Sequence, residues 1–479
     1  MPSAVKASLL LVCLCLAMPA HAQIGNFQHI IIVIQENRTP DNMFQGLCTS
    51  PFGKSASCST TPSSSQYDIS TKDWHDKTAT GGIRQPAGIA LANGYDVDHS
   101  HNGFITTCDL NKTTGVCRMD GAANTNCTGT CVSNPHFKFV SNTNSILNPY
   151  LTMATSYGWA NYMFQTNQGP TFPAHQFLFG GTSAPSATDD AIGTFADSNM
   201  FPDTNNPQAG CIAGSNIHVN LIEANGKTGQ MYPCFEHQTM SDLLESVHIT
   251  WKYYTPGAGS IVTAPNAIDH ICGPSEATGG SCIGSDWKGS VVIKPSTVLT
   301  DIGNCKLAGV TWVTPSGQNS DHPKSNTGGG PSWVASIVNA IGNHKKCSDG
   351  ELYWNNTAIL VTWDDWGGWY DHEPPTILAG AEGDFQYGFR VPFMFVSAYT
   401  QAGTISNDRL DFGSVLRFVE HNFGIAEGAL DFADARSNKD LSNFFNLKLV
   451  ARPFQTIPTA LNANFFLNDK TPDTDPDDY

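Results

Sequence analysis

The most constraining feature of the sequence is an uninterrupted apolar run, residues 29–34, which ends abruptly in the polar segment Gln-Glu-Asn-Arg-Thr-Pro-Asp. Its β-branched residues predict a strand that is buried on both faces, as in the centre of a parallel sheet. In open α/β sheets ligands bind at the carboxyl ends of strands, so Glu36 and Asn37 are candidate oxygen ligands for a metal. The alternative is a strand-to-helix turn in which Thr39 or Asp41 caps the helix.

Two further apolar runs are also followed by polar pairs. They are residues 307–314, followed by Asp321 and His322, and residues 358–363, followed by Asp364 and Asp365. The carboxyl ends of parallel strands share one edge of a sheet, so the three polar clusters can converge. Adjacent buried carboxylates repel each other, and one would take up a proton unless a divalent cation lay beside them. For the last pair, a solvated turn is the alternative.

Thr171 follows a turn at Gly169 and Pro170 and precedes Pro173. Because proline is favoured in the first turn of a helix, Thr171 is expected at or near the N-cap. There its hydroxyl meets backbone N–H groups and the positive end of the helix dipole, a position that can hold a phosphate or stabilise a threonine alkoxide. An ordinary capping threonine is the alternative.

His99 and His101 lie two residues apart in a polar segment. As metal ligands they would have to lie on a strand, where alternate residues share a face. In a loop they could instead donate hydrogen bonds to an anion. The third possibility is a polar loop that carries two surface histidines.

Strand patterns alternate with helix patterns along much of the chain, which predicts an α/β fold with a mostly parallel sheet and helices on both faces. Segments rich in Ser, Thr, Gly and Cys between these elements predict loop insertions that are pinned by disulfides. We expect residues 23–468 to form one domain with insertions. The short, acidic and proline-bearing segment 469–479 is expected to be a disordered tail.

The N-terminus predicts export, because residues 1–22 combine a basic start, a short apolar block and an Ala-x-Ala site, the pattern of a signal peptide. Cys13 and Cys15 lie in this segment, which leaves 14 − 2 = 12 cysteines. An even number in an exported chain suggests up to six disulfides. Spacing suggests the sequential pairs Cys48–Cys58, Cys108–Cys117, Cys127–Cys131, Cys211–Cys234, Cys272–Cys282 and Cys305–Cys347. We therefore expect a secreted or periplasmic protein without a transmembrane segment.

The charge balance is acidic, with 42 Asp and Glu against 25 Lys and Arg. No basic stripe is visible, which argues against nucleic acid as a partner. Oxygen ligands from Glu36, Asn37, Asp364 and Asp365 instead describe a site for one hard divalent cation, whose identity stays open among Ca, Mg, Mn, Zn and Fe. A Thr171 hydroxyl bound to the same ion would lose its proton more readily.

The segment ENRTPDNMF resembles the E-N-R-[ST]-x-D opening of the bacterial phosphoesterase family, which groups phospholipases C with secreted acid phosphatases. The segments NQGPTFPAHQFLFGGTS, VTPSGQNSDHP, TWDDWGGWYDHEPP and GFRVPFMFVSAY are similar to further blocks of this family, in the same order. The resemblance implies an alkaline-phosphatase-like α/β core. It also implies that Glu36, Asn37, Asp364 and Asp365 bind the metal and that Thr171, touching the same metal, is the nucleophile.

The same resemblance implies that His322, together with His99 or His101, contacts the phosphoryl oxygens or protonates the leaving group. The chain departs from the family pattern at Trp366, where members often carry a histidine, and it ends too early for the C-terminal β-domains of the long phospholipases C. The expectation is a secreted, metal-dependent hydrolase of phosphate esters with a threonine nucleophile, of the acid-phosphatase type. The alternative is a phospholipase C that cleaves phosphatidylcholine-type phosphodiesters.

Overall fold

The structure is a computed structural model. It describes residues 25–201, 208–223, 227–348, 350–376, 387–437 and 439–477. The predicted signal peptide, residues 1–22, lies outside this part of the chain.

The centre of the fold is an eight-stranded sheet with the strand order β17-β16-β18-β1-β19-β20-β12-β21. In chain order its strands are β1 (His29–Gln35), β12 (Gly158–Phe164), β16 (Trp251–Thr255), β17 (Val291–Ile293), β18 (Val310–Val313), β19 (Thr357–Trp363), β20 (Phe393–Val396) and β21 (Thr404–Asp411). β1 pairs in parallel with β18 and β19, and all of its residues are buried. Among the sheet's strands β20 runs antiparallel to both neighbours. The predicted mostly parallel sheet is confirmed, and the apolar run 29–34 lies at its centre.

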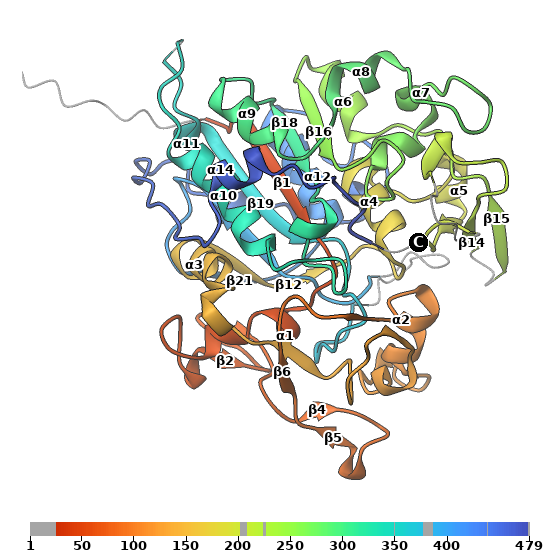
Figure 1. Cartoon of the computed structure of the whole chain (residues 1–479), viewed down its shortest axis with the longest axis vertical. Coiled ribbons are helices and arrows are strands. Elements are labelled where there is room, and N and C mark those ends of the chain that lie inside the picture. The colour runs from red at the N-terminus through yellow and green to blue at the C-terminus, as the bar shows by residue number, and fades with distance from the viewer. Residues whose placement is uncertain are drawn as a thin grey trace, which may run out of the picture.

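Helices cover both faces of this sheet (Figure 1). One group packs around α10 and consists of α3 (Asn148–Ser156), α9 (Thr297–Gly303), α10 (Gly330–Gly342), α11 (Tyr353–Asn356) and α14 (Ala463–Asn468). The other group consists of α4 (Thr171–Gly180), α6 (Met240–Ser246), α12 (Phe412–Phe423) and α13 (Ala433–Arg436). The α/β class expected from the sequence is therefore the one observed. None of the helices in the described part of the chain is long and apolar enough to cross a membrane.

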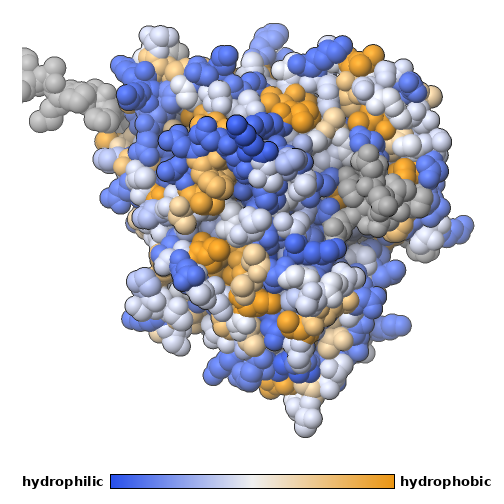
Figure 2. Space-filling model, viewed as in Figure 1, coloured by the Kyte–Doolittle hydropathy of each residue, from blue (hydrophilic) through white to orange (hydrophobic). Residues whose placement is uncertain are grey.

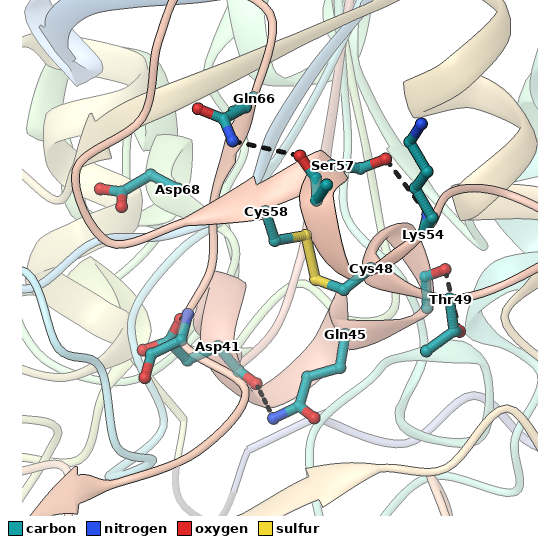
Figure 3. The surroundings of a disulfide bond; sticks show 12 residues. Asp41, Gln45, Cys48, Thr49, Lys54, Ser57, Cys58, Gln66 and Asp68 are labelled. Atoms are coloured by element: carbon teal, nitrogen blue, oxygen red, sulfur yellow. Dashed lines mark hydrogen bonds between the residues drawn. A yellow bond between two sulfur atoms is a disulfide. The ribbon is translucent and has the colours of Figure 1, made fainter.

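A lobe of short elements, residues 44–147, is inserted between β1 and α3 and extends below the sheet in Figure 1. It contains α2 (His101–Cys108) and the strands β2 (Cys58–Ser59), β3 (Tyr67–Asp68), β4 (Trp74–His75), β5 (Ile83–Arg84), β6 (Ala87–Ile89), β7 (Tyr95–Val97), β8 (Leu110–Asn111), β9 (Val116–Cys117), β10 (Cys127–Gly129) and β11 (Lys138–Val140). Figure 3 shows its disulfide Cys48–Cys58 beside Gln45, whose amide donates to the Asp41 carbonyl at 3.3 Å.

All six predicted disulfides are present. The lobe holds Cys48–Cys58, Cys108–Cys117 and Cys127–Cys131. A second insertion, with β13 (Phe195–Ala196), β14 (Val219–Ile222) and β15 (Thr228–Met231), holds Cys211–Cys234, and the remaining pairs are Cys272–Cys282 and Cys305–Cys347. The predicted insertions and their sequential pairing are confirmed.

A buried group of charges ties the lobe to the core. The Arg390 guanidinium donates to Asp371 Oδ1 at 2.9 Å and to Asp68 Oδ2, on the lobe, at 3.0 Å. The His372 ring lies 2.8 Å from Asp41 Oδ2 and 3.1 Å from Asp68 Oδ1. Asp41 thus belongs to this charge cluster rather than capping a helix.

The cap of the short helix α1 (Pro40–Met43) is Thr39, whose side chain accepts from the Asn42 N–H at 3.1 Å. The turn after β1 therefore leads into a helix that is capped by Thr39, one of the two capping residues that the sequence suggested. This cap does not exclude a metal site, because Glu36 and Asn37 precede it and take no part in the capping bond.

Substituting Arg390 by methionine is expected to lower the free energy of unfolding by about 3–5 kcal/mol, because it leaves Asp68 and Asp371 buried without their cation. Urea denaturation followed by tryptophan fluorescence measures this. Arg409→Met is the matched control, since Arg409 pairs with Glu373 at the surface and should cost no more than about 1 kcal/mol. Equal losses in the two variants would contradict the assigned role of the buried cluster.

Candidate active site at the carboxyl edge of the sheet

Four parallel strands of the sheet carry candidate site residues after their carboxyl ends, which lie at the same edge. β18, β1 and β19 are mutually parallel, and β12 shares their direction because β20, between β19 and β12, is antiparallel to both. Glu36 and Asn37 follow β1, Asp364 and Asp365 follow β19, His322 lies in the loop after β18, and Thr171 begins α4 after β12. The expected convergence of polar strand ends is observed, and the contribution of β12 adds to it.

The turns after β1 and β19 are joined through their backbones. The Asn37 N–H donates to Asp364 Oδ1 at 3.1 Å, and the Arg38 N–H donates to the Asp365 carbonyl at 3.1 Å. Gly367 has φ 62°, and a Cβ at this position would lie 2.4 Å from the Asn37 carbonyl oxygen. A glycine is therefore required for the two turns to approach this closely.

The cluster of Glu36, Asp364 and Asp365 is fully buried. Both carboxylate oxygens of Glu36, Asp364 Oδ2 and Asn37 Oδ1 have no hydrogen-bond partner among the described residues. Burial and repulsion by Asp364 raise the pKa of Glu36 and of Asp365 well above the usual values. These oxygen acceptors converge without donors, and their negative charges repel each other. Such a site fits a hard divalent cation, which would offset the repulsion.

Thr171 lies at this cluster. It is the first residue of α4, whose N-cap is Pro170 and makes no side-chain capping bond. The Thr171 hydroxyl donates to Asp365 Oδ2 at 3.3 Å, and the side chain is fully buried. The expected place at a helix start is confirmed, with the hydroxyl directed to a carboxylate.

His175 is a site residue that the sequence reasoning missed. It lies one helical turn after Thr171, and its Nε2 is 3.4 Å from Glu36 Oε1 and 3.9 Å from Asp364 Oδ2. Its Nδ1 lies 3.3 Å from the Tyr253 hydroxyl, and burial lowers its pKa to about 3, so the ring is neutral at pH 7. The available signal was the i, i+4 spacing from Thr171, which places both side chains on one helix face.

Of the two histidines that lie two residues apart, His99 belongs to the carboxylate cluster. Its Nδ1 donates to the Val97 carbonyl at 2.9 Å, which leaves Nε2 3.2 Å from Asn37 Nδ2. The His101 Nδ1 instead lies 3.1 Å from the Gln168 carbonyl, in the loop before α4. Neither histidine lies on a strand, since β7 ends at Val97.

His322 faces His99 across the site, with 5.9 Å between the ring centroids. Its Nε2 lies 2.7 Å from Asp477 Oδ1 and 4.0 Å from Asp96 Oδ2. Burial opposes protonation of His322, but Asp477 and Asp96 outweigh this and raise its pKa to about 9. The neighbouring Asp321 turns away and accepts hydrogen bonds from the Tyr150 hydroxyl at 2.7 Å and the Trp363 indole at 3.1 Å.

Trp366 directly follows Asp365 in the turn after β19. It is fully buried, its ring meets His99 edge-on at 6.3 Å, and it packs against Phe104 and Phe389. This residue therefore supplies an apolar wall beside His99 rather than a polar group.

The structure describes residues 469–477 of the segment expected to be a disordered tail, and it packs this part against the site. Asp477 is 4% exposed, and its Oδ2 accepts from the Asn199 amide at 2.9 Å. Composition suggested disorder because the segment lacks apolar residues. Its polar contacts are instead with residues that are far away in the sequence. The sequence contained no signal for these contacts.

The fold and the site define a class of protein, namely α/β enzymes with a carboxylate-rich candidate metal site at the sheet edge. The model of the phosphoesterase family matches residues 27–426, so the chain belongs to the phosphoesterase family, as the motif resemblance implied. The protein is a hydrolase that acts on phosphoric ester bonds.

The similar curated proteins include phospholipases C. The chain is 22% identical to phospholipase C A of Mycobacterium tuberculosis over 85% of this chain and 75% of that one. It is 24% identical to the non-hemolytic phospholipase C of Pseudomonas aeruginosa over 97% of this chain and 63% of that one. Among solved structures, a protein in the alkaline phosphatase superfamily from Vibrio parahaemolyticus has a TM-score of 0.32 and 10% identity, over 58% of this chain and 61% of that one. That likeness is too distant to inform the site.

Proposed function

We propose that this phosphoesterase hydrolyses phosphomonoesters in the manner of an acid phosphatase, with Thr171 as nucleophile and one divalent metal ion as cofactor. The observation that carries the proposal is the Thr171 hydroxyl, 3.3 Å from Asp365 Oδ2 within a cluster of buried oxygen acceptors. The six disulfides support export, because such bonds persist in oxidising compartments.

The donor set for the metal is Glu36, Asn37, Asp364, Asp365 and Thr171, and the unpartnered Nε2 of His175 is a sixth candidate ligand. Once bound, the ion lowers the pKa of the threonine hydroxyl and offsets negative charge on the phosphoryl oxygens. A nitrogen ligand would favour borderline ions such as Zn or Fe over Ca.

Each residue of the site then has its own role in the reaction. The Thr171 oxygen attacks phosphorus while its proton passes to Asp365, and the bond from phosphorus to the leaving oxygen breaks. Protonated His322 gives its proton to that oxygen, and the N-terminus of α4 stabilises the equatorial charge. Water then attacks the phosphothreonine, which releases phosphate and restores the hydroxyl.

A phospholipase C activity is the second candidate, and the names of the similar curated proteins favour it. Figure 2 shows apolar residues in small groups on the face in view. The lobe that carries His99 also exposes the large apolar side chains Ile105, Leu110 and Val116, at 53%, 46% and 45%. Apolar side chains near the site would suit a lipid substrate.

A substrate panel tests both candidates. We expect turnover of p-nitrophenyl phosphate to exceed that of p-nitrophenylphosphorylcholine and of phosphatidylcholine vesicles, and dialysis against EDTA to abolish it. A preference for the choline diesters would favour the phospholipase. Undiminished turnover after chelation, with no metal left in the protein, would contradict the metal-dependent mechanism.

The pH dependence tests the role of His322. In the enzyme without substrate, Asp477 and Asp96 raise its pKa to about 9, against burial and the nearby His99, so the ring carries its proton below that pH. The pH dependence of kcat/KM reports this free-enzyme value. We expect kcat/KM to be level through neutral pH and to fall about tenfold per unit above about pH 9. His322→Gln should lower kcat about 10²-fold and remove this limb. A limb that persists in the variant would assign it to another group.

A further inference from the structure

We propose that residues 469–477 are an internal ligand of the active site. The Asp477 carboxylate then occupies the place of a substrate phosphoryl group, and the segment must move out of the active site before substrate binds. The inference rests on the proposed function, since it takes the region between Thr171, His99 and His322 as the phosphoryl site.

The contacts of Asp477 are those expected of a bound anion. Its Oδ1 lies 2.7 Å from His322 Nε2 and 3.7 Å from His99 Nε2, and its Oδ2 accepts from the Asn199 amide at 2.9 Å. Asn199 also accepts from the Phe172 N–H at 3.0 Å, at the start of the helix that carries Thr171. The carboxylate is thus held by His322 and by Asn199, which contacts the helix of the nucleophile, and it lies beside His99. A phosphoryl group could use the same donors.

The residues before Asp477 are held by loops on the same edge of the sheet. Asp475 accepts from the Ser260 hydroxyl at 2.9 Å and from the Ile261 N–H at 3.3 Å. The Pro476 carbonyl accepts from the Ser325 hydroxyl, and the Thr474 carbonyl accepts from the Gly317 N–H at 2.9 Å. These contacts define the course of the segment toward Asp477.

Gly317 allows the segment to lie close to the loop after β18. A Cβ on Gly317 would lie 2.6 Å from Thr474 Oγ1 and 2.8 Å from the Asp475 carbonyl oxygen. Its φ is not in the left-handed region, so alanine is compatible with the loop backbone. A methyl group at this position would therefore displace the segment without altering its charge.

The segment is attached in a way that permits release. Of its residues, Pro476 and Asp477 are buried, and the others are partly or fully exposed. The contacts of the segment described above are hydrogen bonds and ion pairs, which contribute modestly because water replaces them on release. Phe466, in α14 before the segment, packs edge-on against Trp333 and anchors the chain independently of it.

Three variants of the full chain test the proposal. Asp477→Asn removes the charge, and Gly317→Ala displaces the segment. Asp469→Asn is the matched control, because it removes a carboxylate of the same segment that accepts from the Thr471 N–H at 2.9 Å. With p-nitrophenyl phosphate we expect kcat/KM to rise about tenfold in Asp477→Asn, mainly through a lower KM, since an internal ligand lowers apparent affinity.

Gly317→Ala should raise kcat/KM in the same direction, and the double variant should gain no more than the larger single gain, because both changes release the same segment. Asp469→Asn should match the wild type. Calorimetric titration with inorganic phosphate gives a second readout, with about tenfold tighter binding expected in Asp477→Asn. Tighter phosphate binding without turnover in any form would refute the proposed hydrolysis but not the internal ligand.

Two results would overturn the inference. A lower kcat with unchanged KM in Asp477→Asn would make Asp477 a positioning residue for His322. A loss of one metal equivalent in the same variant, measured by mass spectrometry of metals, would make Asp477 a ligand in the group with Asp96, His99 and His322.

Discussion

Replacing Thr171 by alanine is expected to lower kcat for phosphate ester hydrolysis by about 10³-fold or more, a loss typical of an enzyme without its nucleophile. The reason is local, since the substitution removes the hydroxyl that lies 3.3 Å from Asp365 Oδ2 and leaves the buried start of α4 otherwise in place. Steady-state turnover of p-nitrophenyl phosphate by metal-loaded protein measures the effect.

Thr171→Ser is the matched control, because it keeps the hydroxyl and should retain most of the activity. The alanine variant should show a thermal midpoint close to that of the wild type. Rapid quenching with acid should trap a phosphorylated protein in wild type and serine variant, but not in the alanine variant. Wild-type turnover by Thr171→Ala would exclude the threonine mechanism.

Substituting Asp365 by asparagine is expected to have opposite effects with and without metal. With metal, the loss of a charged ligand should reduce bound metal from about one equivalent to near zero and abolish turnover. In chelator-treated protein the same variant should be more stable than the wild type. Burial and Asp364 raise the pKa of Asp365 well above the usual value, so its ionised form destabilises the metal-free fold at neutral pH.

Thermal unfolding at pH 7 in EDTA and in excess metal separates these effects. Ligand binding at 100 times Kd stabilises the wild type by about 2.7 kcal/mol, and the variant should not gain this. Asp73→Asn, at the exposed surface, should behave as the wild type in both conditions.

His175→Gln tests the additional candidate ligand and should weaken metal binding by about 10–100-fold. An Asp365→Asn protein that retains one equivalent of metal would contradict the site.

The parts of the fold that could be predicted are those in which a continuous apolar run is compatible with only one element, a buried strand. The apolar runs 29–34 and 358–363 became the strands β1 and β19. Residues 152–162 have no single period, because they contain the end of α3 and the start of β12. The antiparallel direction of β20 depends on packing that sequence patterns do not express.

Some residues of the candidate site could likewise be predicted from the sequence, and others could not. Glu36, Asn37, Asp364 and Asp365 could be found because strand ends of a parallel sheet meet at one edge, and Thr171 because proline and glycine mark the helix start. The choice of His99 over His101 depended on how the lobe docks. Asp477 could not be found, because an acidic terminal segment has the composition of a solvated chain.

The docking of the lobe has a consequence for when the enzyme becomes competent. His99 comes from the lobe, whereas Asn37 and Trp366, which it touches, come from the core. A Cβ on Gly368 would lie 2.8 Å from the Val97 carbonyl oxygen, so the two parts meet at backbone distance. The constellation of His99, Asn37 and Trp366 is therefore complete only in a chain whose lobe has folded and docked on the core.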